Sequence, residues 1–312
     1  MKSGIPSSNS LKRIILVSLL FLATMGNAQT GLSPSDRIDS LFSKYTSNTP
    51  GVAVGIVKNG KLIFSKGYGN ANLAYDIPIT TKTVFNVASV SKQFTAFAIY
   101  LLADQGLIRL EDTIRTYIPE LPQYQKPISI GQLLEHSSGL RDQWALLMLS
   151  GWQMEDIIST EQILKLVTKQ KGLNFEPGSR FEYSNTGYTL LAEIIERVSG
   201  QSFAQFTKDH IFEPLKMYDS GFLDDFHKIV KNKAHSYELK NGQYVKKNLH
   251  TSNAGPSNLL TTVDDLVKWN NYFERPIVGN KKLLEAFNSI SRLKNGKPVV
   301  FNTIGTDTLY HA

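Results

Sequence analysis

A serine and a lysine three positions apart could act as a nucleophile and its base. Ser89 and Lys92 belong to the tetrapeptide Ser-Val-Ser-Lys. A helical spacing of three places both side chains on one face, roughly 4.5 Å apart along the axis. A serine hydroxyl is a weak nucleophile until a neighbouring base accepts its proton, and a lysine becomes such a base when burial and the positive end of a helix lower its pKa. The pair therefore indicates an activated serine.

The same spacing can also arise by chance, because Ser291 and Lys294 share it. The context of the two pairs differs. Asn295-Gly296 follows the second pair and is typical of a hairpin turn. The first pair opens the segment 91–105, which is apolar almost all round and is followed by Gly106, where a helix cap is expected. A helix without a polar face is a buried helix, so we favour the first pair.

A second group of polar side chains comprises Tyr183, Ser184 and Asn185. We expect them in a loop between Pro177-Gly178 and a helix that begins near Tyr188. A tyrosine beside a Ser/Lys pair can pass protons to a leaving group, while an asparagine amide can donate to a substrate carbonyl and hold the lysine. The alternative is that Ser184 or Asn185 only caps the helix.

The elements that must position these residues follow from periodicity and turn signals. Residues 51–69 alternate apolar and small side chains around Asn59-Gly60, which predicts a β-hairpin. Apolar residues at helical spacing predict helices over 34–45, 188–198 and 263–273, and Gly200 is expected to close the second of them. The connectors are short and rich in proline, and no repeat or low-complexity tract interrupts them.

Composition excludes several classes of protein. The net charge of the 312 residues is +7 and the lysines are scattered, so no basic stripe with interleaved aromatics predicts nucleic-acid binding. The chain has no cysteine, which excludes disulfides and thiolate metal sites. The histidines show no compact ligand spacing, so we expect no metal and no cofactor. His136 is interpreted as structural, because the chain has no G-x-S-x-G nucleophile elbow that would suggest a Ser-His triad.

The first 28 residues have the pattern of a signal peptide. Three basic residues precede the apolar run 14–25, and the small residues 26–28 follow it. This run is about twelve residues, shorter than the roughly twenty that span a bilayer, so we expect no permanent membrane anchor. We predict export to the periplasm or the extracellular space, with 29–312 as the mature unit.

Beyond these motifs, the chain resembles the serine β-lactamase superfamily, which includes class C β-lactamases, D-alanyl-D-alanine carboxypeptidases and related esterases. The resemblance covers nearly all of residues 35–275, with the segments in family order, among them GVAVGIVKNGKLIFSKGYG, FNVASVSKQFTAFAI, ISIGQLLEHSSGL and FEPGSRFEYSNTGYTLLAEIIERVSGQSF. It implies a single α/β (α+β) unit. An antiparallel sheet flanked by helices would be built from 29–80 and about 256–312, with a mostly helical region over about 81–255.

The resemblance also implies roles for individual residues. Ser89 would be the acylated nucleophile and Lys92 its base, with Tyr183 and Asn185 as the second motif. The expected reaction is hydrolysis through an acyl-enzyme on a β-lactam, a D-alanyl peptide or a small ester, so the partner would be a small-molecule or peptidoglycan-derived substrate. The sequence does not choose among these substrates and leaves the oligomeric state open.

The family has a third motif, Lys-Thr-Gly or His-x-Gly, on a strand that lines the active site. The best match is His311, followed by Ala312 where the sequence stops. We therefore expect the C-terminal strands of the family to be missing, together with one oxyanion-hole donor, whose loss typically lowers the rate by roughly 100- to 1,000-fold. The alternatives are a truncated, inactive homologue and a non-catalytic ligand-binding module.

Overall fold

The computed structural model describes residues 32–153, 155–303 and 306–309. By its internal contacts the chain divides into two units, Met1–Lys44 and Tyr45–Ala312. Within the described ranges, no helix combines the length and apolar character needed to cross a membrane. The expected signal peptide and His311 lie outside these ranges.

The described part of the first unit contains helix α2, Pro34–Leu41. Its N-cap is Ser33, whose hydroxyl accepts from the Asp36 N–H while the Asp36 carboxylate accepts from the Ser33 N–H, both at 3.2 Å. This reciprocal capping box satisfies two backbone donors that a helix start would otherwise leave unpaired. The predicted helix over 34–45 thus exists but ends earlier, at Leu41.

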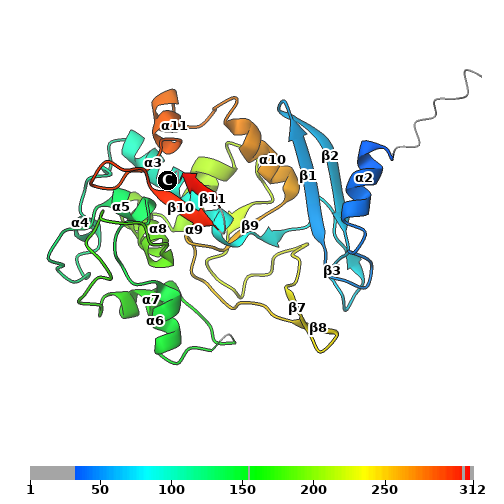
Figure 1. The fold of residues 1–312 in the computed structure, drawn as a ribbon, viewed down its shortest axis with the longest axis horizontal. Coiled ribbons are helices and arrows are strands. Elements are labelled where there is room, and N and C mark those ends of the chain that lie inside the picture. The colour runs from blue at the N-terminus through cyan, green and yellow to red at the C-terminus, as the bar shows by residue number, and fades with distance from the viewer. Residues whose placement is uncertain (1–31, 154, 304–305, 310–312) are drawn as a thin grey trace, which may run out of the picture. The chain divides into compact units, whose positions relative to one another are not determined.

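The second unit combines helices with small antiparallel sheets of two or three strands (Figure 1). This confirms the predicted α/β class, although the strands are divided among several sheets. The strands are β1 (Val52–Lys58), β2 (Lys61–Tyr68), β3 (Asn70–Asn72), β4 (Ile77–Pro78), β5 (Phe85–Asn86), β6 (Gly221–Phe222), β7 (Tyr237–Lys240), β8 (Gln243–Lys246), β9 (Leu259–Thr261), β10 (Val300–Thr303) and β11 (Thr306–Leu309). The helical elements are η1 (Ala88–Val90), α3 (Ser91–Asp104), α4 (Ile114–Tyr117), α5 (Ile130–Leu134), α6 (Gln143–Leu149), α7 (Thr160–Val167), α8 (Asn185–Ser199), α9 (Phe203–Thr207), η2 (Lys208–Phe212), α10 (Val263–Tyr272) and α11 (Lys281–Phe287).

The predicted hairpin is formed by β1 and β2. Lys58 faces Lys61 across a two-residue turn, in which Asn59 and Gly60 both have positive φ, 51° and 69°. Positive φ at both positions matches the twist of the flanking strands. The hairpin packs beside α10 (Figure 1), and a Cβ added to Gly55 would lie 2.6 Å from a methyl of Val263. Glycine in β1 therefore allows this close approach.

The core of the second unit is centred on α3, the helix predicted to be buried. Phe94 and Phe97 are completely buried, and their rings lie 4.5 and 5.3 Å from the ring of Trp269 on α10. On another side α3 packs against α8, which ends at Gly200 in the left-handed conformation, with φ 71°. Glycine adopts this conformation at little cost, so it ends the helix where the sequence predicts.

A three-stranded sheet with the order β5-β9-β6 holds the chain that enters α3. Phe85 and Asn86 pair with β9, and the Val87 N–H donates to the Leu259 carbonyl at 3.0 Å. The next residues form the single turn η1, which continues directly into α3. The start of the buried helix is therefore fixed on one side by the core and on the other by β9.

Replacing Phe97 with alanine should destabilise the fold by about 3–5 kcal/mol, because it opens a cavity among the rings of Trp269, Tyr272 and Phe287, which lie within 5.5 Å. Urea unfolding followed by circular dichroism measures this change. Tyr75→Ala is the control, since this side chain is 77% exposed and its loss should change the stability by less than about 0.5 kcal/mol. Equal effects of the two variants would contradict a core centred on α3.

Candidate active site

The Ser89 and Lys92 side chains meet where η1 continues into α3. The Lys92 Nζ lies 3.2 Å from the Ser89 Oγ, within hydrogen-bond distance. Lys92 is buried at 5% exposure, so its amine can approach Ser89 without a full hydration shell. Ala88, directly before Ser89, has φ 46°, and the Asn86 side chain accepts from its N–H at 3.0 Å. A left-handed alanine is strained, and such strain often marks a functional turn.

Three acceptors surround the amine of Lys92. They are the Ser89 Oγ, the Asn185 Oδ1 at 2.9 Å and the Pro256 carbonyl at 2.7 Å. An ammonium has three protons, one for each acceptor. A neutral amine has two, which the amide and the carbonyl engage. Its lone pair then faces the hydroxyl of Ser89, so loss of one proton turns the amine into an acceptor for the serine proton.

The environment of Lys92 lowers the pKa of its amine, so the amine loses a proton near neutral pH. Burial lowers the pKa of Lys92 to about 7, because the charged form loses hydration. The carboxylate of Asp142 opposes the shift, since a nearby negative charge favours the ammonium. Both protonation states of Lys92 are therefore populated at physiological pH.

Tyr183 contacts the same serine from the other side of the site. Its hydroxyl lies 2.7 Å from the Ser89 Oγ, and either hydroxyl can be the donor. Burial raises the pKa of Tyr183, with a further increase from Asp142 and an opposing effect of the Ser89 hydrogen bond. The phenol is thus protonated at neutral pH. It can supply a proton to an atom beside Ser89.

The structure corrects the predicted position of Asn185. This residue is the first of α8 and does not belong to a loop, so the helix begins three residues before the predicted start. Ser184 occupies the N-cap position, but its side chain makes no capping hydrogen bond. The acceptor comes from a distant residue instead: the Asp142 Oδ2 accepts from the backbone N–H of Asn185 at 2.6 Å. Ser184 therefore stands at the cap position of α8, but its side chain does not cap the helix.

Asp142 also determines which way the Asn185 amide faces. The same Oδ2 accepts from the Asn185 Nδ2 at 3.0 Å, which turns the amide oxygen toward Lys92. The other carboxylate oxygen accepts from the Trp144 N–H at 2.9 Å and caps α6. One side chain thus connects the starts of two helices and orients a hydrogen-bond partner of the lysine. Nothing in the local sequence around Asp142 marks this role, so it was not predicted.

The Pro256 carbonyl was also missed, because a backbone acceptor has no sequence signature. The loop that carries it is fastened to α3: the Thr95 hydroxyl donates to the Gly255 carbonyl at 2.8 Å, and the Leu259 N–H donates to the Ser91 hydroxyl at 2.9 Å. Gly255 has φ 110°, and a Cβ there would lie 2.7 Å from the Tyr188 carbonyl. Only glycine fits this position, which brings the next carbonyl to Lys92.

His136 lies behind the site and fits a structural role. Its ring is buried, its Nδ1 accepts from the Ser184 N–H at 3.2 Å, and it lies against the Tyr183 ring at 4.4 Å between centroids. Burial lowers the pKa of His136 to about 3, assisted by the charge of Lys92. The imidazole is therefore neutral near pH 7, and it supports the backbone between Tyr183 and Asn185.

Ser89 opens into a cleft of about 520 Å³, which Tyr183, Asn185 and Trp144 also border. Asn258 forms part of another wall. Its amide nitrogen donates to the Leu223 and Thr251 carbonyls at 3.1 and 2.8 Å, and its amide oxygen accepts from Asn86.

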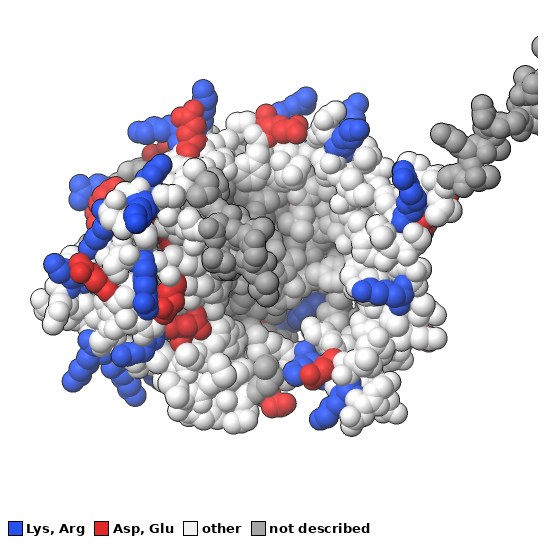
Figure 2. All heavy atoms as spheres, in the orientation of Figure 1, with Lys and Arg blue, Asp and Glu red and all other residues white. Residues whose placement is uncertain are grey.

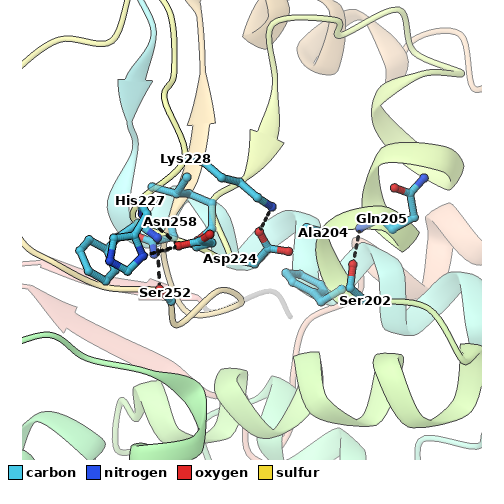
Figure 3. Close-up of polar contacts among 12 residues, drawn as sticks. Ser202, Ala204, Gln205, Asp224, His227, Lys228, Ser252 and Asn258 are labelled. Atoms are coloured by element: carbon cyan, nitrogen blue, oxygen red, sulfur yellow. Dashed lines mark hydrogen bonds and ion pairs between the residues drawn. The ribbon is translucent and has the colours of Figure 1, made fainter.

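A set of polar contacts stabilises the chain behind this wall (Figure 3). The Ser252 hydroxyl accepts from the Phe226 N–H at 3.2 Å, and Lys228 forms an ion pair with Asp224. The wall near Asn258 is thus built from segments that are far apart in the sequence.

Four of the five predicted site residues come together. Lys92 and Tyr183 contact the Ser89 hydroxyl, and Asn185 contacts the Lys92 amine. His311, the fifth, lies outside the described residues. The rival pair does not form a site, because Lys294 lies in a turn, where it pairs with Glu176 at 3.6 Å. Among the described residues, no group of three or more His, Asp or Glu side chains could hold a metal ion.

Comparisons with known proteins identify the family of the chain. Residues 38–302 match the family model described as Beta-lactamase. The chain is 30% identical to Protein flp of Staphylococcus aureus (strain MW2) over 80% of its own length and 51% of that protein, and 28% identical to a D-aminopeptidase of Brucella canis over 81% and 48%. It thus spans about half the length of these curated relatives.

Among solved structures, it resembles the octameric penicillin-binding protein homologue from Pyrococcus abyssi. The TM-score is 0.74 at 29% identity, and the match covers 83% of this chain and 60% of that one.

The amine of Lys92 should titrate with a midpoint near pH 7, whereas exposed lysines titrate near 10.4. Nuclear magnetic resonance of ¹³C-labelled lysines measures the midpoint, with Lys92→Arg to assign the signal. Asp142→Asn should move the midpoint to lower pH, because the carboxylate that favours the ammonium is removed. Asp219→Asn is the control, since this exposed residue is not among the groups that shift this pKa. A midpoint above pH 9, or an upward shift in Asp142→Asn, would contradict the geometry.

Proposed function

The chain belongs to the Beta-lactamase family, and from this premise we propose that it is a serine hydrolase that acts through an acyl-enzyme on Ser89. The observation that carries the proposal is the position of the Lys92 amine. Asn185 and Pro256 each accept a hydrogen bond from it, so the lone pair of the neutral amine faces the Ser89 hydroxyl. A buried lysine with a pKa near the operating pH is suited to general base catalysis.

In the acylation step, neutral Lys92 accepts the proton of the Ser89 hydroxyl while the Oγ attacks the substrate carbonyl. The tetrahedral intermediate collapses, the bond to the leaving group breaks, and Tyr183 donates its phenolic proton to the leaving nitrogen or oxygen. The acylated Ser89 then stands between the Lys92 ammonium and the Tyr183 phenolate. All protons remain within the site.

Deacylation reverses these proton transfers. A water molecule attacks the acyl carbonyl and gives a proton to the Tyr183 phenolate, and the Ser89 oxygen leaves with the proton of the Lys92 ammonium. The free acid is released and both groups regain their starting states. Because burial raises the pKa of Tyr183, its phenolate is a strong base and exists only as a transient species.

The proposed substrates are a β-lactam, a D-alanyl peptide or a small ester, each with a carbonyl that a serine can attack. The similarity to a D-aminopeptidase and to a penicillin-binding protein homologue supports this range of small-molecule and peptidoglycan-derived compounds. We also propose that the protein resides in the periplasm or outside the cell, and the signal-peptide pattern of residues 1–28 supports this location.

Exposure to a fluorescent penicillin and, separately, to a fluorophosphonate should add mass to the protein, and intact-mass spectrometry detects the adduct. Ser89→Ala should abolish it, because the attacking oxygen is lost. Ser291→Ala is the matched control, since it alters the other Ser-x-x-Lys sequence and should keep the adduct.

No adduct on a cooperatively melting wild-type protein would contradict the proposal. A ligand affinity that Ser89→Ala leaves unchanged would then identify a binding module.

The pH dependence of kcat/KM should show two limbs. The rate should rise with pH through about 7, because Lys92 must lose a proton before it can act as a base. It should fall again at strongly alkaline pH, where the Tyr183 phenol ionises and can no longer donate, and this limb should lie above that of an ordinary tyrosine because burial raises the pKa of Tyr183.

Tyr183→Phe should lower kcat by about 100-fold or more and remove the alkaline limb. Tyr218→Phe, at a 73% exposed tyrosine, should change neither, and stopped-flow or steady-state hydrolysis across the pH range distinguishes them. An acid limb that lies at pH 4–5 would argue for a carboxylate base and against Lys92.

A further inference from the structure

An apolar surface continues the Ser89 cleft along α6. We propose that this surface binds the acyl group of the substrate, so that the protein hydrolyses esters of aliphatic acids with a long chain. This inference rests on the proposed function and selects among its substrates. It favours apolar acyl donors over D-alanyl peptides, in which the acyl group carries polar amides. Water adds across the acyl–oxygen bond, and an aliphatic acid and an alcohol are released.

Two tryptophans form this surface. Trp144 borders the Ser89 cleft, and Trp152 borders a second cavity of about 520 Å³ between α6 and α7. The two rings lie 5.6 Å apart between centroids, at an angle of 58°. Leu147 and Leu166 add apolar side chains to the second cavity. The ring pair therefore connects the cleft that contains the nucleophile to a second apolar space.

The ring of Trp152 is held against that of Trp144 by the turn after α6. Gly151 has φ 90°, which lets the chain reverse, and the Trp152 N–H donates to the Leu147 carbonyl at 3.1 Å. The indole N–H of Trp152 donates to the Asp156 carbonyl at 3.4 Å, and both rings pack against the hydrophobic core. The surface is therefore already formed before a ligand binds.

The position of Trp144 assigns it to the acyl group and not to the leaving group. Tyr183 must face the leaving group, because it supplies the proton. The Asp142 carboxylate accepts from the backbone N–H groups of Trp144 and Asn185, at 2.9 and 2.6 Å. The start of α6 is thus held beside the asparagine that contacts Lys92. A chain on the acyl carbon that extends past Asn185 therefore meets Trp144.

Charged groups do not interrupt this surface. The sequence over 143–154 contains no Asp, Glu, Lys or Arg. On the face drawn in Figure 2, the surface over α6 shows no charged side chains. At the second cavity Lys165 pairs with Glu161 at 2.8 Å, and the Asp156 carboxylate accepts from the Gln153 N–H at 2.8 Å. The charged side chains among the described residues that border this cavity are thus already engaged.

The apolar contact provides the selectivity. A methylene group moved from water onto an apolar surface gains roughly fourfold in affinity when it is fully buried. A chain that covers both rings buries several methylene groups, so the gain should reach about 10-fold even when each group is only partly covered.

Two p-nitrophenyl esters with the same leaving group, the butyrate and the octanoate, test the inference. Release of nitrophenolate is followed by absorbance, and the rate with Ser89→Ala is subtracted as background. The measured quantity is the ratio of kcat/KM for the octanoate to that for the butyrate. Because both esters undergo the same chemical steps, a general loss of activity cancels in this ratio.

We expect a wild-type ratio of about 10 or more. Trp144→Ala and Trp152→Ala should each lower it by about 10-fold, because each variant removes one half of the ring pair. Trp144→Phe should retain most of the ratio, since an aromatic surface remains. Leu149→Ala is the matched control, because this apolar side chain on α6 is 85% exposed and borders neither cavity. Its ratio should equal that of the wild type.

A wild type without preference for the octanoate would overturn the inference, and this measurement decides even where a variant does not fold. Ratios in Trp144→Ala and Trp152→Ala within twofold of the wild-type value would overturn it as well. Failure of the proposed function looks different: neither ester is hydrolysed faster than with Ser89→Ala, and the fluorophosphonate adds no mass. Ser89-dependent hydrolysis without a chain-length preference keeps the function and rejects only the apolar acyl contact.

Discussion

The candidate site depends on one buried amine and on the two acceptors that orient it. A lysine in the interior is unfavourable unless its hydrogen-bonding capacity is matched, and Lys92 finds its partners in the Asn185 side chain and the Pro256 carbonyl. Each partner belongs to a different segment, so α3, α8 and the loop before β9 must all be in place. The packing of the helical core and the chemistry of Ser89 are therefore consequences of the same arrangement.

Local sequence patterns predicted the helices and turns that are determined by neighbouring residues. The hairpin at Asn59-Gly60, the buried helix that starts at Ser91 and the end of α8 at Gly200 were all predicted, because turn conformation and apolar periodicity are properties of neighbouring residues. The Ser89, Lys92, Tyr183 and Asn185 group was identified from spacing and from the resemblance to a family. Their meeting within hydrogen-bond distance required the fold.

Contacts between distant residues explain what the sequence could not predict. The start of α8 was placed three residues late, because Asp142, which accepts the Asn185 N–H, lies 43 positions earlier in the chain. Pro256 acts through a backbone carbonyl, a group that every residue possesses. The strands were expected in one antiparallel sheet but form several small ones, since pairing depends on partners that periodicity does not reveal.

The backbone of Ala88 has a consequence for how this protein can evolve. A non-glycine residue at φ 46° costs the folded state about 1 kcal/mol or more, and this strain lies immediately before the nucleophile. Glycine at this position would relieve the strain, but it would also allow the serine turn more conformations. Glycine at residue 88 would thus favour stability, whereas alanine favours a well-ordered nucleophile. This is a stability–activity trade-off that depends on one methyl group.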